Sequence, residues 1–231
     1  MQLDNKVAIV TGVSKGIGLA TVKALLSCGC KVAGWSRSKP DLEHDNFFFY
    51  KTDVRDMESV GRSYDATVSD LGADISILVN NAGLGFEGGI DSIEPKLWHQ
   101  MFETNVDGIF YCSRLVIPAM KKNDLGHIIN ISSIAGNTGI ANMAAYSATK
   151  HAVMGLSHSM YKELRNDGIK VTCIYPGSVN TNFFDHIDSV EANEGMMNPE
   201  DIADTVIHCL QSSANYHHVD IEVRPLKPKR K

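Results

Sequence analysis

The chain has 231 residues, a length that fits one ordinary domain. Hydrophobic residues make up 43% of it and charged residues 21%, which excludes a disordered or fibrous protein. The formal net charge of −5 argues against a nucleic-acid-binding protein. We interpret the basic end of the chain as a solvated tail; it contains Lys227, Lys229, Arg230 and Lys231.

Segments that would direct the chain to a membrane are not visible in the sequence. No apolar run approaches the length of a membrane span, and the first residues lack the features of a signal peptide. The five cysteines form no CxxC pair, so we expect a reduced, cytoplasmic protein. Cys28 and Cys30 have no second pair nearby, and the nine histidines show no ligand spacing. We therefore expect no metal site.

Short apolar runs alternate with helix-length segments along the whole chain. Strands are predicted at residues 6–10, 31–35, 47–50, 75–79, 127–131, 169–174 and 219–223. Their continuous hydrophobicity indicates burial on both faces, as in a parallel sheet covered by helices. Helices are predicted at residues 16–28, 56–71, 94–121, 144–166 and 199–212. The pattern predicts one doubly wound α/β domain over residues 1–231, with about seven parallel strands and helices on both faces.

One long irregular stretch interrupts this alternation, at about residues 182–198. In such a compact domain a long irregular stretch indicates a lid over the substrate and not a connecting loop without function.

Three glycines follow the first predicted strand, in Thr11-Gly12-Val13-Ser14-Lys15-Gly16-Ile17-Gly18. Glycine lets the backbone approach a ligand closely, and the helix that begins here presents free N–H groups to a phosphate. A tight turn that needs glycine for its own geometry is the alternative. The position in the first strand–helix unit favours cofactor binding.

Four motifs in order resemble the short-chain dehydrogenase/reductase family. They are TGxxxGIG at residues 11–18, NNAG at 80–83, YxxxK at 146–150 and Pro176-Gly177. The resemblance covers essentially the whole chain and is closest to compact carbonyl or 3-oxoacyl reductases. It implies a Rossmann fold, a nicotinamide dinucleotide cofactor, a small-molecule carbonyl or alcohol substrate, and a homodimer or homotetramer.

The residues after the second strand bear on the choice of dinucleotide. Ser36 is neutral and Arg37 is a fixed cation, whereas an acidic residue there would repel a 2′-phosphate. Lys15 in the glycine turn can reach the same phosphate. We therefore expect NADP(H) rather than NAD(H), although Lys15 and Arg37 could be merely solvated, and Asp41 and Glu43 follow a few residues on.

The resemblance implies further cofactor contacts. Asp53 would hold the adenine, Asn80 would lie along the adenosine ribose unless it serves only a strand-ending turn, and Val179 and Thr181 would bind the nicotinamide carboxamide. The full expected set is Gly12, Ser14, Lys15, Gly16, Ile17, Gly18, Ser36, Arg37, Asp53, Val54, Asn80, Ala82, Gly83, Tyr146, Lys150, Pro176, Gly177, Val179 and Thr181.

Tyr146 and Lys150 are four residues apart and share one face of a predicted helix. An adjacent ammonium is expected to lower the pKa of the phenol, so that Tyr146 can exchange a proton with a carbonyl oxygen. Ser133 matches the family's serine, which orients the substrate oxygen; Ser132 is the competing candidate. The resemblance assigns Asn105 to an interruption of its helix, where it would hold a water of the proton relay.

The predicted function is an NADPH-dependent reductase of a ketone or aldehyde, a short-chain enzyme of class EC 1.1.1.-. Met143, Met196 and Met197 are candidate apolar substrate contacts, with gap filling as the alternative. Oxidation of a secondary alcohol or 3-hydroxy acid with NADP⁺ is the alternative direction. Two alternatives are not enzymes: a non-catalytic NADPH-binding sensor, and a scaffold or nucleic-acid partner that uses the basic tail.

Overall fold

The computed structural model describes residues 1–181 and 193–227. They contain a seven-stranded sheet in the order β3-β2-β1-β4-β5-β6-β7, with every neighbouring pair parallel. This confirms the predicted doubly wound α/β fold. The strands are β1 (Val7–Thr11), β2 (Lys31–Ser36), β3 (Phe47–Lys51), β4 (Ile75–Asn80), β5 (Gly126–Ile131), β6 (Ile169–Pro176) and β7 (Asp220–Val223).

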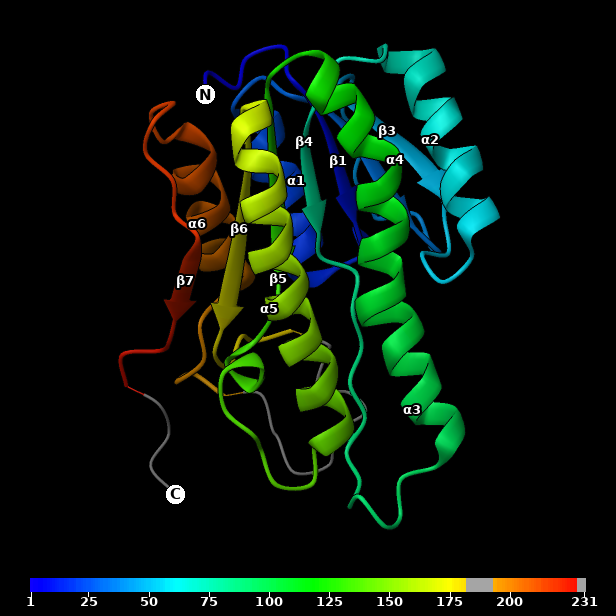
Figure 1. The fold of residues 1–231 in the computed structure, drawn as a ribbon, viewed down its shortest axis with the longest axis vertical. Coiled ribbons are helices and arrows are strands. Elements are labelled where there is room, and N and C mark those ends of the chain that lie inside the picture. Colours follow the sequence, from blue (N-terminus) through cyan, green and yellow to red (C-terminus); the bar gives the residue numbers. More distant parts are fainter. Residues whose placement is uncertain (182–192, 228–231) are drawn as a thin grey trace.

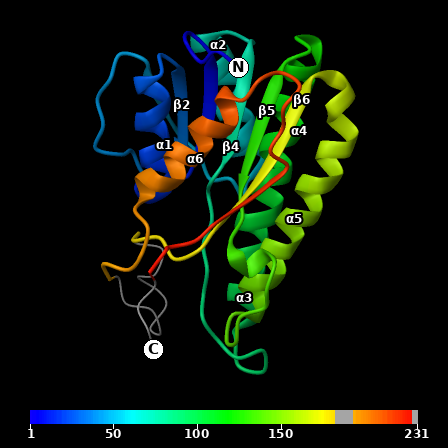
Figure 2. The ribbon, with the colours of Figure 1, turned by 90° about the vertical axis from the view of Figure 1, so that its left-hand side faces the viewer.

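Helices cover both faces of the sheet (Figures 1 and 2). One face carries α1 and α6, and the other carries α2, α4 and α5. Alternate strand residues serve the two layers: Ala8 and Val10 pack toward α1 and α6, and Val7 and Ile9 toward the opposite helices. The helices are α1 (Gly16–Ser27), α2 (Met57–Leu71), α3 (Pro95–Phe102), α4 (Gly108–Lys122), α5 (Ala144–Leu164) and α6 (Pro199–Gln211).

Local sequence signals explain where two of these helices begin. The Asp56 carboxylate accepts a hydrogen bond from the Glu58 amide at 3.0 Å and so caps α2. Asn198 and Asp201 form a reciprocal capping box at α6, and Pro199 occupies its first turn. Residues 193–198 of the expected lid therefore lead into a firmly capped helix, and residues 182–192 lie outside the described residues.

The single helix predicted at residues 94–121 is divided in the structure. A π-helical turn, Glu103–Asp107, separates α3 from α4. Such turns insert an extra residue into the hydrogen-bond ladder and often occur at functional sites. Here the turn carries Asn105, the residue expected to interrupt its helix.

Within the described residues, no helix combines the length and hydropathy that crossing a membrane requires.

Candidate active site

The predicted site residues gather at the carboxyl ends of β1, β4, β5 and β6, at the lower edge of the sheet in Figure 1. The strand order changes direction between β1 and β4, because β2 and β3 extend to one side and β5 to β7 to the other. In doubly wound sheets a ligand binds in the crevice at this point. The fold therefore places the glycine turn and the YxxxK helix beside the same crevice.

The glycine turn needs its glycines for two separate reasons. Gly12 and Gly16 have φ values of +71° and +61°, where a side chain is strained. A Cβ on Gly12 would lie 2.8 Å from the Ala82 Cα, and one on Gly18 would lie 2.5 Å from the Asn81 Nδ2. The turn is thus bare backbone packed against the end of β4. Ser14 and Ile17 are half-buried beside it, and Lys15 is exposed.

Thr11 and Asn81 join the ends of β1 and β4. The Thr11 hydroxyl accepts hydrogen bonds from the backbone amides of Asn81 and Ala82, both at 3.0 Å. The Asn81 side-chain amide donates to the carbonyls of Thr11, at 2.9 Å, and Gly12, at 3.1 Å. Our sequence reasoning singled out neither residue, although both stand inside the motifs quoted above. Their role is to hold the glycine turn against β4.

The loop after β6 reaches the same turn. A Cβ on Gly16 would lie 3.3 Å from the Thr181 methyl group. The Gly177 amide donates to the Val223 carbonyl at 2.7 Å, which ties the residue after Pro176 to β7. Val179 is buried and forms a parallel bridge with Met197. The predicted nicotinamide loop and the glycine turn are therefore neighbours.

The residues expected at the adenosine end lie at the ends of β2 and β3. Ser36 is buried, and its hydroxyl donates to the Ser38 carbonyl at 2.7 Å. Arg37 is exposed. Asp53 makes a two-pronged contact with Arg55, whose Nη2 lies 2.6 Å from a carboxylate oxygen. Hydrogen bonds from Arg55, with a further contribution from the charge of Arg37, hold the pKa of Asp53 below its ordinary value.

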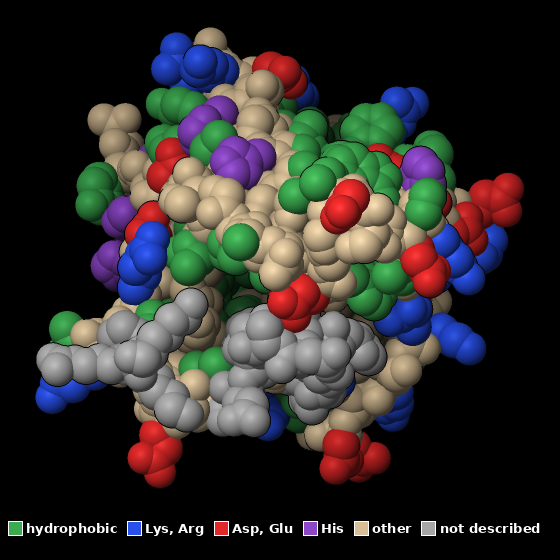
Figure 3. All heavy atoms as spheres, turned by 90° about the horizontal axis from the view of Figure 1, so that it is seen from below, with side chains coloured by type: hydrophobic (Ala, Val, Ile, Leu, Met, Phe, Trp, Pro, Cys, Tyr) green, Lys and Arg blue, Asp and Glu red, His purple; other side chains and the backbone are tan. Residues whose placement is uncertain are grey.

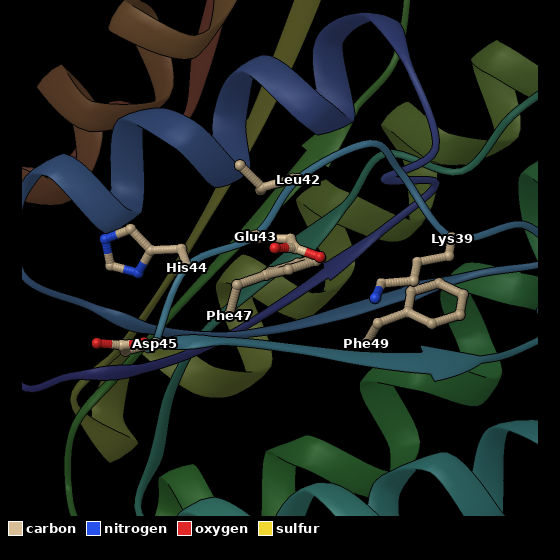
Figure 4. A pocket seen from close by; sticks show the side chains of 7 residues that line it. All are labelled: Lys39, Leu42, Glu43, His44, Asp45, Phe47 and Phe49. Atoms are coloured by element: carbon tan, nitrogen blue, oxygen red, sulfur yellow. The ribbon is translucent and has the colours of Figure 1, made fainter.

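Arg55 was not predicted as a site residue, because an arginine two positions after an aspartate resembles any surface pair. Val54, between them, is buried against Gly108 at the start of α4, where an added Cβ would lie 2.9 Å from a Val54 methyl group. An open hollow lies further along the outer edge of the sheet, between the loop after β2 and β3 (Figure 4). Its lining residues are Lys39, Leu42, Glu43, His44, Asp45, Phe47 and Phe49. Glu43, one of the acidic residues that follow Arg37 in the sequence, lines this hollow.

The Asn80 side chain is committed to the sheet. Its amide donates to the Asn130 Oδ1 at 2.8 Å and to the Ser113 hydroxyl at 3.3 Å, and the residue is 3% exposed. The structure therefore does not bring this side chain to the crevice, and only the Asn80 backbone is available to a cofactor. Gly83 does lie beside the catalytic candidates, because a Cβ there would be 3.7 Å from the Lys150 Nζ.

The Ser133 side chain lies next to the Tyr146 phenol, because it acts to lower the pKa of that phenol. Ser133 caps a short 3₁₀ helix, Ile134–Gly136, by accepting from the Ala135 amide at 3.2 Å. Tyr146 lies in the first turn of α5 and is buried. Ser132 is engaged differently: its hydroxyl donates to the backbone carbonyl of Lys150 at 3.1 Å. Of the two serines, Ser133 is the one whose side chain meets the phenol.

Lys150 lies one turn further along α5 and is 5% exposed. Its Nζ donates to the Ile131 carbonyl at 2.9 Å and stands 5.7 Å from the centroid of the Tyr146 ring. Burial lowers the pKa of Lys150 from 10.5 to about 8. The ammonium is thus held at the end of β5, close to the phenol.

The pKa of Tyr146 differs from the sequence expectation. Burial raises it to about 12, and the hydrogen bond with Ser133 only partly opposes that change. Because desolvation penalises the phenolate more than the serine hydroxyl favours it, the resting phenol stays protonated at neutral pH. The expected lowering by Lys150 is not found in this structure.

Asn105 is buried inside the π-helical turn and faces the loop after β4. Its Oδ1 accepts from the Leu84 amide, and its Nδ2 donates to the Leu84 carbonyl, both at 2.9 Å. The Nδ2 also donates to the Thr149 hydroxyl at 3.0 Å, and that hydroxyl donates to the Tyr146 carbonyl at 2.7 Å. Asn105 therefore connects α5, which carries Tyr146 and Lys150, with the chain segment that follows Gly83.

The three candidate methionines lie in different surroundings. Met143 is half-buried and packs in a hydrophobic cluster that contains Tyr146. Met197 is buried in the core beneath α1 and α6 and pairs with Val179, and Met196 beside it is half-buried. The structure thus places Met143 in the same cluster as Tyr146 and places Met197 in the core. Among the described residues, no group of histidine, cysteine and acidic side chains could hold a metal ion.

Comparisons with known proteins agree with this architecture. The family profile described as short chain dehydrogenase matches residues 6–192. An uncharacterized oxidoreductase of Staphylococcus haemolyticus is 36% identical over 97% of this chain and 99% of its own length. The chain therefore belongs to the short-chain dehydrogenase family.

Two solved structures show the same fold in detail. The closed form of a serine dehydrogenase complexed with NADP⁺ superposes with a TM-score of 0.88 at 29% identity and covers 94% of each chain. A 3-ketoacyl-(acyl-carrier-protein) reductase from Brucella melitensis, complexed with NADH, has a TM-score of 0.87 at 26% identity. That match covers 97% of this chain and 98% of the reductase.

Proposed function

We propose that the protein is an NADPH-dependent oxidoreductase that reduces a ketone or aldehyde to an alcohol. The observation that carries the proposal is the grouping of Ser133, Tyr146 and Lys150: the Ser133 side chain lies next to the Tyr146 phenol, and buried Lys150 stands one turn away on α5, 5.7 Å from the Tyr146 ring. A protonated phenol next to a second hydroxyl suits a carbonyl oxygen, which needs one proton donor and one orienting hydrogen bond.

The residues of the crevice fit a dinucleotide. Gly12 and Gly83 are bare backbone at the carboxyl ends of β1 and β4, where a Cβ would occupy the space beside Ala82 or Lys150. The amino end of α1 directs backbone N–H groups toward a phosphate. The proposed cofactor set is the one given above from the sequence, with Asn80 acting through its backbone. The bound structural relatives carry NADP⁺ in one case and NADH in the other, and exposed Arg37 and Lys15 favour the 2′-phosphate of NADP(H).

The nicotinamide supplies the hydride when it is bound. Tyr146 Oη gives its proton to the substrate oxygen, and the Ser133 hydroxyl donates a hydrogen bond to the same atom. Lys150, with a pKa of about 8, is mostly charged at pH 7 and stabilises the phenolate that remains. Asn105 holds the Leu84 segment and Thr149 in place around these groups. We further propose a cytoplasmic homodimer or homotetramer, as the family resemblance implies.

Oxidation of an alcohol with NADP⁺ is the second candidate, because the same groups act in reverse and one structural relative is a serine dehydrogenase. Both directions require the Tyr146 phenol as the proton carrier. In the oxidative direction the Tyr146 phenolate takes up the alcohol proton. The buried ammonium of Lys150 stabilises this phenolate before the proton is transferred.

The test is NADPH and NADH oxidation at 340 nm against keto esters, diketones, acetoacetyl thioesters, pterins and aromatic aldehydes. Turnover is expected to prefer NADPH and to fall at least about 1,000-fold in Tyr146→Phe. Tyr161→Phe, on the same helix, is the matched control and is expected to retain activity. Turnover that survives in Tyr146→Phe contradicts the mechanism. NADPH binding without turnover of any substrate favours a sensor.

A further inference from the structure

The loop from Gly177 to Thr181 is held on two sides. On one side the Asn180 amide donates to the Met197 carbonyl at 2.8 Å, just before α6 begins. On the other side the Gly177 amide donates to the carbonyl of Val223, the last residue of β7, at 2.7 Å. The proposed function assigns residues of this loop to the nicotinamide. The position of β7 therefore decides where the loop begins.

The contact between Gly177 and the end of β7 is close. A Cβ added to Gly177 would lie 3.2 Å from the Pro225 Cδ and 3.4 Å from the Val223 carbonyl oxygen. Both β6 and β7 point toward the lower face of the molecule in Figure 1. Seen from below, this face is hollowed in the middle, and hydrophobic side chains border the hollow (Figure 3). Because bare backbone packs here against bare backbone, a shift of β7 is passed directly to the loop.

The strand β7 has little buried surface of its own to hold it. It has four residues, Asp220–Val223, which alternate between exposed and half-buried. It lies at the edge of the sheet and pairs with β6. Ile221 and Val223 are only partly buried against the core. Since apolar burial stabilises so short an edge strand only weakly, the contacts of its polar side chains become important.

Asp220 makes such contacts with two other elements. Its Oδ1 accepts a hydrogen bond from the Tyr175 hydroxyl at 2.7 Å. The Nε2 of His158 on α5 lies 3.0 Å from Oδ1 and 2.8 Å from Oδ2. Tyr175 stands directly before Pro176 and Gly177 at the end of β6. Burial and the hydrogen bond to Asp220 raise the pKa of Tyr175, so the phenol stays protonated and continues to donate.

The two contacts of Asp220 differ in their contribution to stability. The side chains of His158 and Asp220 are 40% and 43% exposed, and an ion pair at such exposure contributes little. Tyr175 is only 2% exposed. A hydroxyl on so deeply buried a side chain costs more when it loses its acceptor than the bond itself contributes. The contact between Tyr175 and Asp220 is therefore the stronger link between β7 and the end of β6.

We propose that Asp220 and Tyr175 are positioning residues for the nicotinamide end of the cofactor site. Their hydrogen bond keeps β7 in register with the end of β6, so that the Val223 carbonyl can hold the Gly177 amide. Both residues act through the backbone of the loop and not by touching the cofactor. This inference rests on the function proposed above and adds to it two residues that the sequence motifs do not include.

Two ligands distinguish positioning of this loop from a general loss of structure. NADP⁺ carries the nicotinamide, whereas adenosine 2′,5′-bisphosphate has the adenosine and the 2′-phosphate without it. Calorimetry measures the dissociation constant of each. We expect Tyr175→Phe and Asp220→Ala each to raise the dissociation constant of NADP⁺ about tenfold and to leave that of the bisphosphate within about twofold. Equal weakening of both ligands, or unchanged binding of NADP⁺, overturns the inference.

A conservative variant and a double variant test the contact itself. Asp220→Asn keeps an acceptor oxygen for the Tyr175 hydroxyl, so its NADP⁺ binding should stay within about threefold of the wild type. The double variant Tyr175→Phe/Asp220→Ala should bind NADP⁺ about as well as either single variant, because the two residues share one contact. Additive losses in the double variant, or a tenfold loss in Asp220→Asn, contradict the inference.

Matched controls make the same chemical changes elsewhere. Tyr216→Phe, at a tyrosine that is 57% exposed, and Asp204→Ala, at an exposed position of α6, should alter the binding of neither ligand. Tyr175→Phe removes a single oxygen and keeps the packed ring, so this variant is expected to fold. If it does not fold, the contact serves the stability of the whole sheet and the inference is wrong.

The same measurements separate this inference from the proposed function. If the variants behave as expected but the wild type reduces no carbonyl compound, the proposed reduction fails and the positioning role stands. If the wild type reduces a carbonyl compound but Tyr175→Phe binds NADP⁺ as tightly as the wild type, the positioning role fails and the proposed function stands. A wild type that binds neither ligand overturns both.

Discussion

The side-chain amide of Asn105 forms two hydrogen bonds with the backbone of Leu84: its Oδ1 accepts from the Leu84 N–H, and its Nδ2 donates to the Leu84 carbonyl, both at 2.9 Å. Such a two-bond contact with a peptide unit copies the pairing of a β-ladder. It is made possible by the π-helical turn Glu103–Asp107, which turns Asn105 out of the regular helix ladder. The contact joins the π-helical turn between α3 and α4 to the loop that follows β4.

Replacing Asn105 by alanine should therefore affect both stability and turnover. The substitution removes one buried and two partly buried hydrogen bonds and takes both partners from the Leu84 backbone, so the free energy of unfolding should fall by about 2–3 kcal/mol. We expect kcat to fall more than about tenfold because Leu84 and Thr149 lose their anchor. Urea unfolding and steady-state kinetics measure both effects. Asn123→Ala, at an exposed asparagine, is the control; equal effects from the two variants would contradict the anchoring role.

The glycine turn offers a comparison between two glycine-to-alanine substitutions. At Gly12 the φ of +71° and a Cβ only 2.8 Å from the Ala82 Cα should lower the free energy of unfolding by about 3 kcal/mol. Gly12→Ala should also abolish NADP⁺ binding, measured by calorimetry. Gly61 lies inside α2 with nothing within 4 Å of its added Cβ. Gly61→Ala should therefore stabilise the protein by about 0.5–1 kcal/mol.

Arg37 should determine which dinucleotide is used. It is exposed and lies close enough to influence the pKa of Asp53. Arg37→Ala should raise KM for NADPH about tenfold and leave KM for NADH almost unchanged, because only NADPH carries the 2′-phosphate. Lys39→Ala, in the neighbouring hollow, is the control. An equal rise in both KM values for Arg37→Ala would indicate a general loss of binding instead of phosphate recognition.

The buried ammonium of Lys150 should destabilise the fold at neutral pH. Its pKa falls from 10.5 in the unfolded chain to about 8 in the folded one. This shift lowers the free energy of unfolding by about 3 kcal/mol at pH values where Lys150 is charged in both the folded and the unfolded chain. The unfolded chain binds more protons between these values, so the destabilisation is complete below pH 8 and disappears as the pH rises toward 10.5. Lys150→Met should thus be inactive but more stable than the wild type at pH 7, by about 1–3 kcal/mol.

Denaturant unfolding between pH 7 and 9.5 measures this difference. The stability advantage of Lys150→Met should shrink across that range, before Tyr146, whose pKa is about 12, affects the comparison. Lys122→Met, on the exposed side of α4, is the control and should show no such trend. An advantage that stays constant with pH would show that Lys150 is not a desolvated ammonium.

The sheet and its helices could be predicted from the sequence because each strand is a continuous apolar run. The predicted strand at residues 31–35 matches β2, Lys31–Ser36, and the helix predicted at 56–71 matches α2, Met57–Leu71. Burial on both faces leaves few other ways to arrange such runs. The division of the helix at residues 94–121 was visible only through the family resemblance at Asn105, since no proline or glycine marks residues 103–107.

The site was less predictable where a side chain had a choice of partner. Asn80 and Asn81 are chemically identical, yet one pairs with Asn130 across the sheet and the other holds the glycine turn. Alternation along a strand gives their opposite directions but not which direction meets the crevice. The pKa of Tyr146 was predicted to fall on the basis of a neighbouring charge alone, whereas the depth of burial, which the sequence does not reveal, raises it.

The loop between Gly83 and Pro95 has a consequence for how new specificities could arise. Hydrogen bonds with Asn105 at Leu84 and with Asn142 at Gly88 join this loop to the rest of the site. Ser133 lies just after β5, and Tyr146 and Lys150 belong to α5, so the groups proposed to move the proton stand on elements outside this loop. The loop can be exchanged as a cassette with that of a relative, so that recognition diverges while the proton chemistry is inherited unchanged.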